Sequence, residues 1–181
     1  DLTKTGETIT VRFSNSSPEL ISQFKEISKK LFDAPLTLSS SASDKRPESR
    51  RFNSKLVFEV LESLGSPQSP KSHKIDMSNI LLKIPNNLLA HFLRGYYDTD
   101  GGCVERKIKG SVSVESNSTS KQFSEKLKLV LLRYGIVSKI REREAMPNEK
   151  VKSKYNKFSI HIRGKENLER FRDAIGFTHP D

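Results

Sequence analysis

Residues 92–102 read Phe92-Leu93-Arg94-Gly95-Tyr96-Tyr97-Asp98-Thr99-Asp100-Gly101-Gly102. An apolar run with a glycine near its middle therefore ends in two aspartates and two glycines. The run extends upstream toward Pro85, where a helix can begin. We expect Gly101 and Gly102 to end the helix in the left-handed capping conformation. Its buried face is predicted from apolar side chains spaced three and four residues apart, namely Leu88, Leu89, Phe92, Leu93 and Tyr96.

Small and acidic side chains mark the end of this predicted helix. Gly95 and Thr99 are four residues apart and so share a face, where a second helix could approach closely. Asp98 and Asp100 lie at the negative end of the helix dipole, which is unfavourable without a nearby cation. A buried helix followed by an Asp-Gly turn remains the plain alternative. An EF-hand calcium loop is excluded, because its further oxygen ligands and closing Glu are absent at the required spacing.

The stretch resembles the signature of the LAGLIDADG homing endonucleases, with the nine motif positions running from Leu93 to Gly101. Four residues match that signature identically: Gly95, Asp98, Asp100 and Gly101. The sequence around the motif and the Ile175-Gly176-Phe177 ending resemble the endonuclease domain of an archaeal-type intein. Self-splicing is not expected of these residues alone, since neither end carries the residues that splicing requires.

The composition favours a polyanionic partner. The chain has 181 residues, with 32 Lys and Arg against 22 Asp and Glu, and a net charge of +10. Nucleic acid is the simplest partner for such a balance, and a merely solvated basic surface is the alternative. No membrane span or signal peptide is evident, and Cys103 is the only cysteine. We therefore expect an intracellular protein, in a prokaryotic or archaeal cytoplasm or in an organelle.

The chain uses one pattern twice, and each copy reads strand, helix, strand, strand, helix. In the first copy an alternating strand at 8–13 is followed by a helix that begins at Pro18. In the second copy a strand at 111–115 is followed by a helix that Thr119 and Gln122 would cap. The predicted buried stripes are, by helix, Leu20, Phe24, Ile27 and Leu31; Leu56, Val60, Leu61 and Leu64; Phe123, Leu127, Val130, Leu131 and Tyr134; Leu168, Phe171, Ala174 and Ile175.

This order of elements predicts an α+β fold with helices on one sheet face. The resemblance implies the LAGLIDADG homing-endonuclease fold, with two pseudo-symmetric αββαββα-like halves and saddle-shaped antiparallel sheets. We place the halves at 1–75 and 76–181. A motif helix precedes only the second copy, so the first is expected upstream of Asp1. Such a chain would be a monomer with pseudo-two-fold symmetry; alternatively, Asp1 is a remnant of the first motif, or two chains pair through one motif.

Alternation along the strands predicts a polar sheet face opposite the apolar one. A solvated face is the plain reading of any single strand, but basic residues recur on this face in several strands. A β-ribbon fits the major groove of DNA, where Arg and Lys can bond guanine. The expected partner is double-stranded DNA, with no membrane contact. The predicted DNA-binding residues are Arg12, Ser14, Lys139, Arg141, Arg143, Lys157, Ser159, His161 and Arg163.

The resemblance also implies a chemistry. Asp100, with Gly101 beside it, would be the metal-binding position of this half, and Mg²⁺ or Mn²⁺ the ion. Asp98 would instead orient the helix pair. A basic residue is expected near the metals, with Lys74 preferred over Lys71. The predicted function is a site-specific double-strand DNA endonuclease; the alternative is a non-cleaving DNA- or RNA-binding module of the same fold, such as a degenerate endonuclease, a maturase or a regulator.

Overall fold

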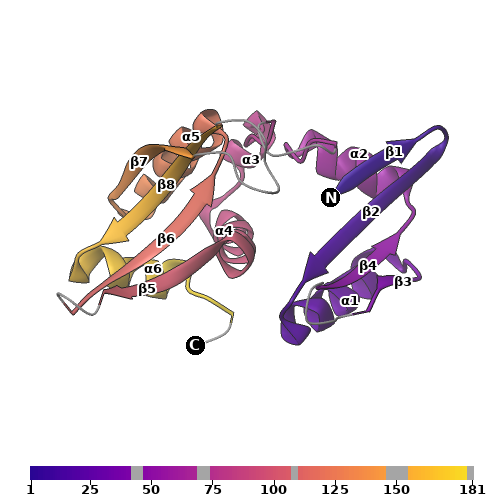
Figure 1. Cartoon of the computed structure of the whole chain (residues 1–181), viewed down its shortest axis with the longest axis horizontal. Coiled ribbons are helices and arrows are strands. Elements are labelled where there is room, and N and C mark those ends of the chain that lie inside the picture. The colour runs from indigo at the N-terminus through magenta and orange to yellow at the C-terminus, as the bar shows by residue number, and fades with distance from the viewer. Residues whose placement is uncertain (42–46, 69–73, 107–109, 146–154, 179–181) are drawn as a thin grey trace. The chain divides into compact units, whose positions relative to one another are not determined.

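The structure, a computed structural model, describes residues 1–41, 47–68, 74–106, 110–145 and 155–178. The chain divides into two compact units, Asp1–Lys74 and Ile75–Asp181 (Figure 1). The expected boundary between 75 and 76 lies one residue from this division. Each unit contains a four-stranded antiparallel sheet, so the predicted fold class is confirmed.

The first unit has a sheet with the strand order β1-β2-β4-β3. Strand β1 was not predicted, and β4 was expected from the repeated order but not placed, because neither shows a clear alternation of polar and apolar residues. The elements along the chain are β1 (Leu2–Thr5), β2 (Thr8–Asn15), α1 (Pro18–Phe32), β3 (Thr37–Ser40), β4 (Glu48–Phe52) and α2 (Lys55–Ser63).

Helix α1 begins where the sequence predicts. The Ser17 side chain accepts a hydrogen bond from the Leu20 amide, and Pro18 takes the first helical position. The buried stripe was partly wrong, however, because Ile27 and Leu31 are 51% and 65% exposed. The helix instead turns Ile21 and Ser28, seven residues apart, toward the sheet.

Helix α2 likewise buries only part of its predicted face. Leu56 and Val60 are exposed, whereas Val57 and Phe58 are buried. The core of the first unit is formed by side chains of its sheet and of α2. These are Leu2, Val11, Phe52, Val57 and Phe58, with Phe24 and Leu61 packed against them.

The second unit contains the complete αββαββα order, from α4 to α6, and its sheet has the order β5-β6-β8-β7. Strand β5 was not predicted, because it follows the motif helix without an intervening turn. The elements are α3 (Asn79–Lys83), α4 (Asn86–Asp100), β5 (Gly101–Arg106), β6 (Ser111–Ser118), α5 (Lys121–Leu132), β7 (Ser138–Ala145), β8 (Tyr155–Arg163) and α6 (Lys165–Ala174).

The cap of α5 differs from the predicted one by a residue. Ser120, not Thr119, is the N-cap, and its hydroxyl accepts a hydrogen bond from the Phe123 amide. The predicted stripe of α5 is otherwise correct, since Leu127, Val130 and Leu131 are buried. The stripe of α6 is also correct: Phe171 and Ile175 are buried, with Leu168 and Ala174 packed against the same core.

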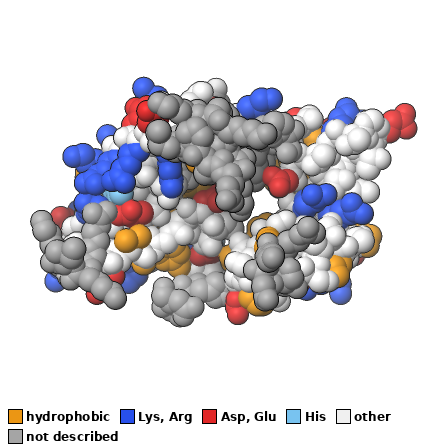
Figure 2. Space-filling model, in the orientation of Figure 1, with side chains coloured by type: hydrophobic (Ala, Val, Ile, Leu, Met, Phe, Trp, Pro, Cys, Tyr) orange, Lys and Arg blue, Asp and Glu red, His pale blue; other side chains and the backbone are white. Residues whose placement is uncertain are grey.

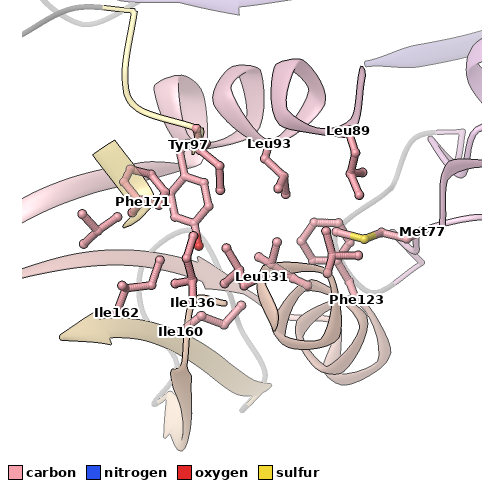
Figure 3. Close-up of a cluster of buried hydrophobic side chains, with 14 of the residues drawn as sticks. Met77, Leu89, Leu93, Tyr97, Phe123, Leu131, Ile136, Ile160, Ile162 and Phe171 are labelled. Carbon is pink, nitrogen blue, oxygen red and sulfur yellow. The ribbon is translucent and has the colours of Figure 1, made fainter. Parts of the chain in front are cut away.

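The motif helix α4 is anchored by one apolar face. Leu89, Leu93 and Tyr97 project from this face into the core of the second unit, toward α5 and β8 (Figure 3). The Tyr97 ring packs edge-on against Phe171, with their centroids 4.9 Å apart. Burying three such side chains contributes several kcal/mol, so the position of the Asp100 end of α4 is fixed by the core.

The helix does not end as expected. Gly101 has φ −107° and ψ −176°, which is extended backbone, and it passes directly into β5. Glycine is required here by space rather than by a left-handed conformation. A Cβ at Gly101 would lie 2.5 Å from Cδ1 of Tyr97 and 2.8 Å from its carbonyl oxygen.

Candidate functional site

The polar face of the second sheet is defined by the register of its strands. Directly paired residues share a face. Lys139 of β7 pairs with His161 of β8, which pairs with Glu115 of β6. The next pairs on the same face are Arg141 with Ser159, Arg143 with Lys157, Ser159 with Asn117, and Arg163 with Ser113.

This register brings the predicted basic residues of β7 and β8 together on one surface, which we call the basic face. Lys139 and Arg143 are exposed, and Arg141, Lys157 and Arg163 are half-buried. Figure 2 shows Lys and Arg side chains gathered over β7 and β8. Helices cover the opposite face of the sheet, where Phe158, Ile160 and Ile162 are buried. The basic face is therefore the side of the sheet that a partner can reach.

Two of the predicted contact residues are already engaged within the protein. The Ser159 hydroxyl donates to Oδ1 of Asn117 at 2.7 Å. His161 is only 6% exposed, and its Nδ1 lies 2.8 Å from Oε1 of Glu115. Sequence reasoning placed His161 on the correct face but missed its burial, because β6 supplies the carboxylate that covers it.

Glu115 is an acidic residue within the basic face. Its Oε1 also accepts from the Ser113 hydroxyl at 2.7 Å and contacts the Arg163 guanidinium at 3.4 Å. Burial opposes ionisation of the carboxyl group, but the hydrogen bonds from Ser113 and His161 outweigh it and lower the pKa of Glu115 to about 2. Glu115 is therefore charged at neutral pH.

The first unit has a smaller basic surface on its sheet. Arg12 of β2 pairs with Arg51 of β4, and Arg51 pairs with Thr37 of β3. Sequence reasoning missed Arg51, because the residues of β4 were not identified. The predicted residue Ser14 donates its hydroxyl hydrogen to Ser49 at 2.9 Å. Nε of Arg12 is buried and has no hydrogen-bond partner among the described residues.

The C-terminal end of α4 is tied to the segment that follows α6. Asp98 accepts hydrogen bonds from the Thr178 amide, at 2.9 Å, and from the Thr178 hydroxyl. Arg94 donates to the Ile175 carbonyl at 2.6 Å. Sequence reasoning missed Arg94, and the role of Asp98 in a helix pair stays a prediction. Within its own unit, Asp98 fixes the orientation of the helix that carries Asp100.

Asp100 itself lies on the exposed side of the last turn of α4. Burial, together with the nearby charge of Asp100, raises the pKa of Tyr96 to about 12, so the Tyr96 hydroxyl stays protonated beside the acid. Across the described ranges, no group of three His, Cys, Asp or Glu side chains could hold a metal ion. The assignment of Asp100 and Gly101 to a metal ion stays a prediction.

The remaining predicted catalytic residues belong to the first unit. Lys74 is exposed in a turn. Lys71 lies outside the described residues. Their assignment to the chemistry stays a prediction.

The face of α4 that carries Gly95 and Thr99 is exposed within the second unit. Nothing described lies within 4 Å of a Cβ built at Gly95. The Thr99 hydroxyl donates to the carbonyls of Gly95 and Tyr96, each at 3.1 Å. These bonds occupy the hydroxyl hydrogen of Thr99, so this side chain presents its methyl group rather than a free donor to a second helix.

Gly95→Ala tests this face in two states. Where no helix packs on α4, alanine should raise the free energy of unfolding by about 0.5–1 kcal/mol, because glycine is a poor helix former. Where a second helix packs there, the added methyl group should weaken that association. Urea unfolding measures the first effect, and sedimentation of the paired form measures the second. Ala90→Gly, in the same helix, is the control for helix propensity alone.

Comparison with known proteins agrees with this architecture. Residues 87–176 match the family described as LAGLIDADG-like domain. The chain carries a LAGLIDADG-like domain. That domain contains α4, with Asp100, and the whole of the sheet that bears the basic face.

Solved structures share the fold of the whole chain. The homing endonuclease I-DmoI, in complex with DNA and Mn, is 15% identical, has a TM-score of 0.61, and matches 99% of this chain and 89% of its own. The N-terminal LAGLIDADG domain of DUF199/WhiA is 17% identical, has a TM-score of 0.60, and matches 99% of this chain and 75% of its own. At these identities the likeness shows the fold alone.

The chain matches curated relatives over only a small part of their own length. The replication factor C small subunit of Methanocaldococcus jannaschii is 32% identical over 168 residues, which is 93% of this chain and 8% of that protein. A probable translation initiation factor IF-2 of the same organism is 40% identical over 112 residues, which is 62% of this chain and 9% of that protein. The matching segment thus occurs in proteins with unrelated names.

Proposed function

We propose that this chain is the DNA-binding and cleaving part of a homing endonuclease, which hydrolyses both strands of a long, specific DNA site. The observation that carries the proposal is the basic face, which lies on the same LAGLIDADG-like domain as the exposed Asp100. Cations on β7 and β8 can neutralise phosphates, and Arg side chains can also read guanine in the major groove.

Cleavage would require a second helix against α4. The exposed Gly95 and Thr99 face is suited to it, and the second helix would add the further carboxylate that Asp100 lacks. The helix would come from a first motif elsewhere in the polypeptide, or from a second copy of this chain. Asp100 would then help hold Mg²⁺ or Mn²⁺, which, when bound, polarises the scissile phosphate and makes its bound water more acidic.

The different names of the proteins that contain similar segments support a proposal about the origin of this chain. A similar segment within a replication factor C small subunit and a probable translation initiation factor supports a segment inserted into host proteins rather than a module serving each host's own activity. We therefore propose an intein-type origin for the endonuclease. An intracellular location follows from such hosts.

A second candidate function is DNA or RNA binding without cleavage. The similarity to the WhiA domain, with a TM-score of 0.60 against 0.61 for I-DmoI, favours it as much as the endonuclease at the level of fold. The two functions share the basic face and differ at Asp100. A DNA-binding measurement therefore tests the feature that both functions share, and a DNA-cleavage measurement distinguishes the endonuclease from the non-cleaving module.

Neutralising the basic face tests the shared part. The triple variant Lys139→Gln, Arg141→Gln, Arg143→Gln should bind duplex DNA more weakly, and the slope of log K against log salt should fall by up to about 2.7, from 0.9 per lost phosphate contact. Fluorescence anisotropy at several salt concentrations measures both. The control, Lys121→Gln, Lys128→Gln, Lys165→Gln, removes the same charge from the helices and should leave the slope nearly unchanged. Equal effects of the two triple variants would contradict binding through the basic face.

A further inference from the structure

The acidic residue within the basic face is the feature that the proposed function does not explain. Three hydrogen-bonding groups converge on one oxygen of Glu115: the Ser113 hydroxyl, His161 Nδ1 and, more distantly, Arg163. Ser113 pairs with Arg163 and Glu115 pairs with His161, so the four side chains occupy neighbouring cross-strand pairs of β6 and β8. We call these four residues the Glu115 cluster.

A carboxylate here has an electrostatic cost for DNA binding, because it repels phosphates. The Glu115 side chain is only 17% exposed, and the cations beside it offset its charge locally. The cost is therefore small, and the remaining effect of Glu115 is to hold its partners in place.

Arg163 is the partner that can reach DNA. Its side chain is 39% exposed, and only its NH2 group contacts the Glu115 cluster among the described residues. A guanidinium has five N–H donors, so most of them stay available outside the cluster. A guanidinium held in one plane loses less conformational entropy on binding and suits the bidentate contact with guanine O6 and N7.

His161 supplies a second observation at the same place. Its Nε2 is buried and has no hydrogen-bond partner in the described part of the chain. Buried polar atoms normally have a partner. Since Nδ1 faces Glu115 and Nε2 is enclosed by the protein, the ring does not reach a duplex itself, and its contribution is the contact with Glu115.

We propose that Glu115 is a positioning residue for base recognition: it holds Arg163 and His161 in fixed orientations, so that Arg163 reads a base instead of following the nearest phosphate. This inference rests on the proposed binding of duplex DNA. It assigns sequence preference at one position of the site to the Glu115 cluster, and general affinity to Lys139, Arg141, Arg143 and Lys157.

Selection from a library of randomised duplexes tests the inference. The wild-type chain should enrich a consensus sequence. Glu115→Gln should bind random duplex at least as tightly as the wild type, because a negative charge is removed, but its preference at one consensus position should fall about tenfold. Arg163→Ala should lose preference at the same position. Glu142→Gln, an equal charge change on β7, is the matched control and should keep the whole consensus.

Each result bears on a different statement. An unchanged consensus with Glu115→Gln would overturn the inference, as would equal loss of preference at every position. If Glu115→Gln does not fold, Arg163→Lys replaces it, because it keeps the charge and removes only the planar fork; an unchanged consensus with Arg163→Lys overturns the inference too. Wild-type binding without any consensus would contradict both the inference and the proposed site specificity while leaving DNA binding intact, and no binding to duplex DNA would overturn the proposed function altogether.

Discussion

Asp100→Asn should abolish DNA cleavage while leaving DNA binding intact. The substitution keeps the size of the side chain and removes the charge that would hold the divalent ion. Loss of metal-assisted stabilisation of several kcal/mol corresponds to a fall in cleavage rate on the order of 10³-fold. Binding should be unchanged or slightly tighter, because a carboxylate near the scissile phosphate opposes binding when no metal is present. Asp100 is exposed, so the fold should not be affected.

The measurement uses the natural polypeptide, with any sequence that flanks residues 1–181 retained, and a duplex obtained by selection. Cleavage is followed with Mg²⁺ and with Mn²⁺, and binding is measured without a divalent ion. Glu105→Gln is the control, since Glu105 is an exposed acid of β5, the strand that follows Asp100. Equal cleavage by Asp100→Asn and the wild type would remove Asp100 from the chemistry. Binding without cleavage by the wild type would instead favour the non-cleaving module.

The sequence predicted the structure best where the local pattern of residues and their burial in the folded protein agree. Most of the apolar face of α4 was predicted from spacing: Leu89 and Leu93 are fully buried, although Leu88 is exposed and the buried Tyr97 was not in the predicted stripe. The start of α1 at Pro18 and the basic face of β7 and β8 were likewise predicted from residue type and alternation. In each case the local signal and the burial point the same way, so nothing in the tertiary structure overrides it.

The predictions failed where a partner element decided the outcome. On α1 and α2 several apolar residues compete for the buried face, and packing against the sheet selects Ile21 and Val57 over Ile27 and Val60. The Glu115 cluster depends on the register of β6 against β8, which no single strand reveals. The hydrogen bonds from Thr178 to Asp98 join residues 80 positions apart. Such pairings follow from the whole fold rather than from any one segment.

Gly101→Ala should destabilise the second unit markedly, whereas Gly102→Ala should not. The methyl group at position 101 would lie 2.5 Å from the Tyr97 ring and 2.8 Å from the Tyr97 carbonyl. The amide of Gly101 donates to that same carbonyl, which holds the two backbones together. The ring has little room to move, because Tyr97 is 1% exposed and packs against Phe171. Overpacking of this kind costs about 1–3 kcal/mol.

Gly102 is the matched control in the same strand. A Cβ there would meet nothing within 4 Å, and its backbone needs no left-handed conformation, so alanine should change the free energy of unfolding by less than about 0.5 kcal/mol. Urea unfolding at a constant m-value measures both variants. Equal stability of the two would contradict close packing as the reason for Gly101. Because Asp100 precedes the crowded position, Gly101→Ala should also move its carboxylate, and cleavage should fall even under conditions where the variant is fully folded.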